Sequence, residues 1–187
     1  GLLTKLRDKN DPQWLQLYAA SLAYKKMYEK AAETLARAAE ILPHPELLRR
    51  ASLAALNAKR PDLAQPMLEK IVTLGCGDVA VHSRLAFIYI GQNDNINAAR
   101  HFEVLHRIAP DEISHSINLA ISLSSENPER ALEIYNELCA KPAPPLQAIC
   151  RRAQLFKAMG RVKDAWMSLG KFRSEYWDKP EYVLQVR

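Results

Sequence analysis

The sequence predicts an all-α fold, an α-solenoid built from antiparallel helix pairs. Two observations lead to this class: a period of 33 or 34 residues runs through the chain, and apolar residues recur at helical spacing within each period. Turn-forming residues separate the halves of each period, and no segment shows the apolar and polar alternation typical of strands.

The period is marked by five alanines that stand 33, 34, 33 and 34 residues apart, namely Ala31, Ala64, Ala98, Ala131 and Ala165. An apolar residue follows each alanine four positions later, at Leu35, Leu68, Phe102, Tyr135 and Leu169. A further small or apolar residue follows three positions after that, at Ala38, Ile71, Leu105, Leu138 and Phe172. Residues three and four apart share one face of a helix, so these positions predict the buried face of the second helix in each pair.

Each period divides into two helical halves. In the third period these are residues 79–94 (VAVHSRLAFIYIGQND) and 97–110 (NAARHFEVLHRIAP), both with apolar residues at spacings of three and four. Gly, Asn, Asp and Pro gather between the halves, as in IGQNDN at 90–95 and MGRVKD at 159–164, and LPHP at 42–45 closes a pair. The sequence therefore predicts ten helices in five antiparallel pairs.

The periodic alanines have a physical reason. Two helices of a stacked pair must approach closely, and a large side chain at the crossing would push them apart. In the fifth period, Gly160 is placed to end the first helix in the left-handed conformation that other residues resist. Asp164 is placed in the first turn of the second helix, where a carboxylate complements the helix dipole.

This pattern resembles the tetratricopeptide repeat (TPR) family, whose unit has about 34 residues. The residues that carry the resemblance are Leu85, Ala86, Tyr89, Ala98, Phe102, Leu105 and Pro110 in the third repeat; Leu15, Tyr18, Ala19, Leu22, Tyr28, Ala31, Leu35, Ala38 and Pro43 in the first; and Ala153, Phe156, Gly160, Ala165, Leu169 and Phe172 in the fifth. The second and fourth repeats depart from it, since each is one residue short and Cys76 stands where a closing proline is expected. The pentatricopeptide repeat, an RNA-binding helical family, is the alternative.

The resemblance covers residues 12–179 and implies a right-handed superhelix. We expect one TPR-like domain over residues 1–187, with repeats at about 12–44, 45–78, 79–111, 112–145 and 146–179 and the start of a further helix at 180–187. Because the chain begins with Gly1 rather than Met, we interpret it as a piece of a longer protein.

The resemblance also implies that partners bind along the concave face, which the first helices line. By register that face holds Gln13, Gln16, Ala20, Tyr24, Arg49, Leu53, Leu56, Asn57, Ser83, Arg84, Phe87, Ile90, Gln147, Arg151, Gln154 and Lys157. From these we select as candidate partner-binding residues Arg49, Asn57, Arg84, Phe87, Ile90, Arg151, Gln154 and Lys157. The carboxylate clamp of chaperone-binding members is absent, because Gln16 and Ala20 occupy its first two positions. The cations among the candidates either recruit an acidic or extended peptide or are solvated charges.

The sequence predicts no catalytic centre and no cofactor. It contains no GxxxxGK[ST], GxGxxG, GxSxG, CxxC or HExxH motif. Two ExxH tetrads, Glu103–His106 and Glu112–His115, have the spacing of a di-metal helical site, but Pro110 lies between them. We therefore expect no metal and assign the five histidines to polar helix faces and loops.

Composition leaves the compartment open. The formal net charge of +5 permits an acidic partner or nucleic acid without requiring either. No apolar run approaches the ~20 residues that span a bilayer, and no signal peptide is visible. The odd, sparse cysteines, Cys76, Cys139 and Cys150, favour the reducing cytoplasm, with the periplasm as the alternative if a longer chain carries a signal peptide. For Cys139 and Cys150, which flank KPAPP, we expect packed thiols, with a disulfide as the alternative.

Three functions follow as hypotheses. The first is a non-catalytic scaffold that binds a protein segment or subunit through its concave groove. The second is a TPR region of a larger bacterial transferase or polysaccharide export protein, as in relatives with such arrays. The third is single-stranded RNA binding of the pentatricopeptide kind.

Overall fold

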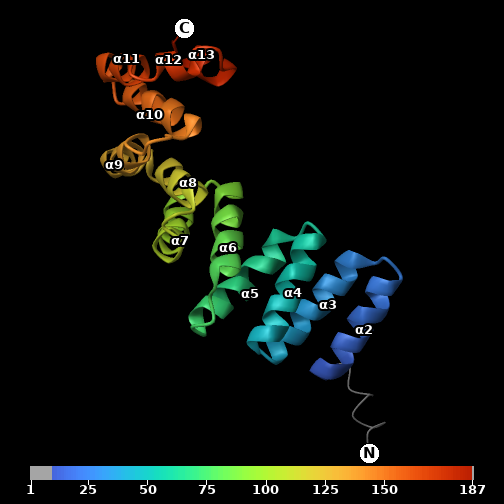
Figure 1. The fold of residues 1–187 in the computed structure, drawn as a ribbon. Helices are drawn as coiled ribbons and strands as arrows, with labels where there is room; N and C mark the ends of the chain where they lie inside the picture. Colours follow the sequence, from blue (N-terminus) through green and yellow to red (C-terminus); the bar gives the residue numbers. More distant parts are fainter. Residues whose placement is uncertain (1–9, 187) are drawn as a thin grey trace, which may run out of the picture. The chain divides into compact units, whose positions relative to one another are not determined.

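The computed structural model describes residues 10–186, and every regular element within them is a helix (Figure 1). The helices are α2 (Pro12–Tyr24), α3 (Tyr28–Ile41), α4 (Pro45–Asn57), α5 (Pro61–Thr73), α6 (Val79–Gly91), α7 (Asn95–Ile108), α8 (Ile113–Leu123), α9 (Pro128–Cys139), α10 (Leu146–Ala158), α11 (Val162–Gly170), α12 (Arg173–Tyr176) and α13 (Pro180–Val186). The structure is 77% helical, which confirms the all-α prediction. The short α12 was not predicted.

The chain divides into two compact units, residues 1–88 and 89–187, with the boundary inside α6. In the first unit, α2 packs on α3, α3 on α4 and α4 on α5. In the second unit, α7 to α11 pack in the same sequential manner, and α13 contacts both α10 and α11. Contacts between neighbours along the chain therefore dominate each unit, as in solenoids.

The periodic alanines are buried, as the register predicts. Ala64, Ala98, Ala131 and Ala165 have no exposed surface, and Ala31 retains 4%. The apolar positions that follow them are buried too, except Leu35, which is half-buried. The second helices thus bury one stripe each, and the alanine lies at its start.

The turn between the helices of a pair repeats one backbone geometry. Lys26, Lys59, Asn93 and Gly160 occupy equivalent positions and have φ between 58° and 74°. The next backbone N–H then donates to a carbonyl five residues earlier, as from Arg161 to Phe156 at 2.8 Å. This closure satisfies carbonyls at the end of the first helix. The expected left-handed Gly160 is confirmed, and three non-glycine residues adopt the same left-handed conformation.

The fourth pair departs from this geometry. Its first helix, α8, has only 11 residues, and the connection to α9 lacks a left-handed residue. The N–H of Asn127 instead donates to the Leu123 carbonyl, four residues earlier, at 2.7 Å. In the second pair, Gly75 with φ of 71° ends α5, so no proline is needed at Cys76.

Gly160→Ala tests the turn geometry. We expect the free energy of unfolding to fall by about 1 kcal/mol, because a residue with a Cβ resists the left-handed region. An added Cβ would meet nothing within 4 Å, so the cost is that of the backbone alone. The matched control is Gly170→Ala, at the end of α11, where φ is not positive and the space is also open. Thermal unfolding followed by circular dichroism should show a loss of stability only for Gly160→Ala. Equal losses of stability in the two variants would contradict the left-handed turn geometry at Gly160.

Candidate partner-binding surface

Two large apolar side chains are exposed at equivalent positions of consecutive first helices. Leu53 of α4 is 45% exposed, and Phe87 of α6, one period later, is 56% exposed. By contrast, Leu85 and Ala86 beside Phe87 are completely buried. Tyr89 is half-buried and stacks on His101, with ring centroids 5.6 Å apart. Phe87 is therefore a surface residue, while its neighbours supply the core.

Guanidinium groups lie beside this apolar pair in the register. Arg50 and Arg84 are one period apart and precede Leu53 and Phe87 by three residues, which is one helical turn. Arg50 is exposed and donates to Gln16 Oε1 at 3.1 Å, which links α4 to α2. Arg84 is half-buried. Arg50 was absent from the sequence-based candidates, although its spacing from Arg84 was the signal that would have found it.

Arg49 is used within the fold. Its guanidinium donates to Asp78 Oδ2 at 2.7 Å and also to the backbone carbonyl of Cys76. Asp78 in turn caps α6, accepting from the N–H of Val81 at 2.9 Å. The hydrogen bond from the Val81 N–H is the largest cause that lowers the pKa of Asp78, and the charge of Arg49 lowers it further. Burial raises the pKa but does not outweigh these two effects. Arg49 thus fixes the first turn of α6 against α4 and helps to position Phe87.

Asn57 lies elsewhere, at the edge formed by the interhelical turns. It lines a hollow of about 470 Å³ together with Tyr28, Lys30 and the left-handed residues Lys26 and Lys59. Three ammonium groups therefore surround this hollow, with Glu29 as the one carboxylate among its lining residues.

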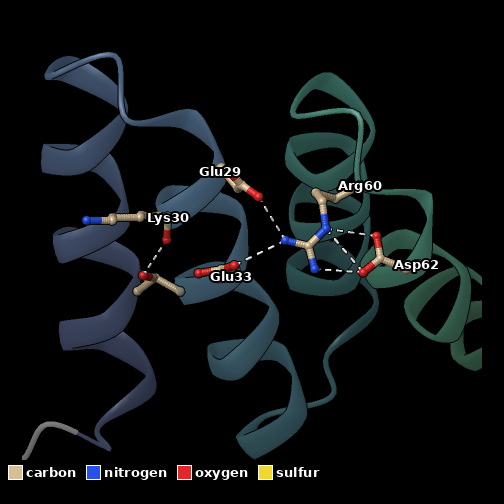
Figure 2. Close-up of polar contacts among 6 residues, drawn as sticks. Glu29, Lys30, Glu33, Arg60 and Asp62 are labelled. Atoms are coloured by element: carbon tan, nitrogen blue, oxygen red, sulfur yellow. Dashed lines mark hydrogen bonds and ion pairs between the residues drawn. The ribbon is translucent and has the colours of Figure 1, made fainter.

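Glu29 belongs to an ion-pair network centred on Arg60, shown in Figure 2. Arg60 Nη1 lies 3.2 Å from Glu29 and 3.1 Å from Glu33, and Nη2 lies 2.7 Å from Asp62. The hydrogen bond to Asp62 is the largest cause that raises the pKa of Arg60, and the bonds to Glu33 and Glu29 raise it further. The same bond from Arg60 lowers the pKa of Asp62. The network joins the first helix pair to the second at the protein surface. Sequence analysis missed it, because its members come from two segments about 30 residues apart, α3 and the start of α5.

In the second unit, the remaining candidates differ in their surroundings. Ile90 is half-buried, whereas Arg151 and Gln154 are exposed neighbours whose Nη1 and Oε1 atoms lie 3.5 Å apart. Lys157 is exposed, and its Nζ donates to the backbone carbonyl of Gln185 in α13 at 2.8 Å. Lys157 therefore helps to hold α13 beside α10.

The residues with catalytic or metal-binding chemistry are dispersed. Among residues 10–186, no three His, Cys, Asp or Glu side chains gather as a metal site would require. Glu103 lies 4.0 Å from Arg130, and His106 Nδ1 lies 2.9 Å from Ser116 Oγ. The three cysteines are free thiols, and burial raises the pKa of Cys139 and of Cys150. Within the same residues, no helix combines the length and the apolar character needed to cross a bilayer.

Stacked helix pairs with buried alanines and a repeated left-handed turn define the fold as that of the tetratricopeptide-repeat proteins. Among solved structures, the chain is similar to YrrB, described as a TPR protein with an unusual peptide-binding site, with 14% identity, a TM-score of 0.69, and coverage of 94% of this chain and 92% of that one. It is also similar to the MamA protein, with 14% identity, a TM-score of 0.67 and coverage of 91% and 94%. For MamA from Desulfovibrio magneticus RS-1 the identity is 15%, the TM-score 0.63 and the coverage 94% and 99%. No protein-family model and no curated protein matches the sequence.

The Asp78 cap predicts a pH dependence of stability. Because folding lowers the pKa of Asp78, its contribution is present above the unfolded pKa and is lost as pH falls through the folded one. Asp78→Asn keeps a good helix cap but removes the charge. We expect the variant to be less stable than wild type at pH 7, and the difference to shrink below about pH 4. Urea unfolding at pH 7 and pH 3 measures this, with Asp111→Asn, an exposed loop change, as control; a difference independent of pH would contradict the account.

Proposed function

We propose that the chain is a non-catalytic scaffold that binds a segment of a protein partner on the α4 and α6 face of its first unit. The anchors are Leu53 and Phe87, and the flanking cations are Arg50 and Arg84. The observation that carries this proposal is the exposure of two large apolar side chains at the same register position of consecutive first helices. Phe87 keeps 56% of its surface exposed, and an exposed aromatic residue on a rigid helix is a favourable binding anchor.

The geometry of the face supports an extended segment as the ligand. Leu53 of α4 and Phe87 of α6 hold equivalent positions one period apart, so a ligand that contacts both must run across successive helix pairs. An extended chain advances about 3.3 Å per residue and therefore covers such a span with few residues. The similar protein YrrB is described as having a peptide-binding site, which also supports a peptide ligand for this fold.

The cations indicate the chemistry of the segment. Arg50 and Arg84 lie one turn from the apolar pair, and guanidinium groups bind carboxylates in bidentate geometry. The formal net charge of +5 favours encounter with an acidic partner. We therefore propose a segment that combines apolar anchors with Asp or Glu. Arg151 and Gln154 of the second unit stay sequence-based predictions, whereas Arg49 and Lys157 act mainly within the fold.

Phe87→Ala tests the anchor. A peptide selected from a random display library against the wild-type chain should bind the variant at least fivefold more weakly, since burial of an aromatic anchor contributes more than ~1 kcal/mol. Calorimetric titration gives the dissociation constant, and circular dichroism should show unchanged unfolding. Met167→Ala, which truncates an exposed apolar residue of the second unit, is the matched control.

Arg84→Ala tests the contribution of charge to binding separately from that of the apolar contact. Arg84→Ala should weaken an acidic peptide more at low salt than at high salt, because exposed charges are screened. Selected peptides that bind Phe87→Ala and Arg84→Ala as tightly as wild type would refute this surface.

A further inference from the structure

A pocket of about 310 Å³ lies between α3, α4 and α5 of the first unit, away from the proposed partner-binding residues. Its apolar lining includes four buried residues, Ala36, Ala39, Leu48 and Met67, each at most 5% exposed. Leu63, Pro43 and Pro66 line it further, and Glu40 and Lys70 are its charged members.

The pocket exists because short side chains replace long ones at this helix junction. Ala36 and Ala39 of α3 occupy register positions that hold Glu69 and Val72 in α5, Glu103 and His106 in α7, and Asn136 and Cys139 in α9. On the opposite wall, Pro66 of α5 stands where Glu33, Arg100 and Glu133 stand in α3, α7 and α9. Three departures from the repeat pattern thus fall around one cavity.

The size of the cavity suits a small ring system. A dry apolar cavity of ~150 Å³ binds benzene, and ligand sites begin at roughly 300 Å³. The volume therefore fits two fused rings. Met67 on the floor offers a flexible thioether, which adapts to ring shape and contacts aromatic edges favourably.

The rim favours a hydrogen-bond donor at the polar end of the ligand. Glu40 lies in the last turn of α3, where the helix dipole is negative and a carboxylate is disfavoured. A cationic donor beside Glu40 would offset this unfavourable placement.

We propose that this pocket binds a small aromatic amine, with one or two fused rings against Met67 and the amine at Glu40. Lys70 is the one cation among the lining residues, so it opposes the amine and limits the ligand to a single positive charge.

The test uses the four methionine methyl groups as reporters in the intact chain. Tryptamine is titrated into protein labelled with ¹³C at the methionine methyls, and the resonance of Met67 should shift while those of Met27, Met159 and Met167 stay in place. Ala36→Leu fills the cavity and should weaken binding at least tenfold. Ala23→Leu adds the same side chain at an exposed site of α2 and should leave binding unchanged.

Charge variants test the placement of the amine. Glu40→Gln should weaken the binding of tryptamine at least threefold and leave the binding of uncharged indole unaffected, whereas Lys70→Gln should strengthen the binding of tryptamine.

A Met67 resonance that stays fixed at saturating tryptamine, or four methionine methyl resonances that shift alike, would overturn the site. Equal loss of indole and tryptamine in Glu40→Gln, or binding of a tryptophan peptide without tryptamine, would overturn the aromatic-amine assignment. If Ala36→Leu fails to fold, the Met67 resonance in the wild-type chain and the two charge variants still test the proposed site.

Discussion

The close approach of helices at buried alanines is the constraint on which the rest of this structure depends. A helix pair cannot bury both of its apolar faces by itself, so each pair must pack on its neighbours. That packing requires a small residue at each crossing, and the five periodic alanines supply it with at most 4% of their surface exposed. Since the contacts are local, the register assigns a separate task to each helical position. Some positions fill the core, some close the turn, and others remain at the surface.

Both proposed sites use positions of the repeat that the core packing leaves exposed or that carry a smaller side chain than in other repeats. Leu53 and Phe87 share a register position that the core does not need, and both remain exposed. The pocket between α3, α4 and α5 arises where Ala36 and Ala39 stand in place of the longer residues found in the second, third and fourth repeats. Both sites lie in the first unit, one on its first helices and one mainly on its second helices. A repeat fold can therefore accommodate both of the proposed sites, which differ in chemistry, without a change in its core.

Much of the fold was predictable because the period is encoded locally. Alanine spacing predicted the buried stripe, and helical register placed Phe87 outside the core. The left-handed Gly160 followed from its residue type, but Lys26 and Lys59 did not, because their conformation is imposed by the helix closure rather than preferred by the residue. The candidate surface was only partly predictable. Arg49 pairs with Asp78, 29 residues away, and Arg60 pairs with Glu29 and Glu33 of α3 as well as with nearby Asp62, so tertiary placement decides most of their partners.

The measurement that tests the helix-crossing account most directly is the stability of Ala98→Leu. Ala98 is completely buried at the start of α7, so a larger side chain there must push apart helices that the account holds in close contact. Denaturant unfolding should show a loss of about 1–3 kcal/mol. The same substitution at exposed Ala158, at the end of α10, should change stability by no more than about 0.5 kcal/mol. Equal and small effects at the two sites would contradict the register on which the fold and both proposed sites rest.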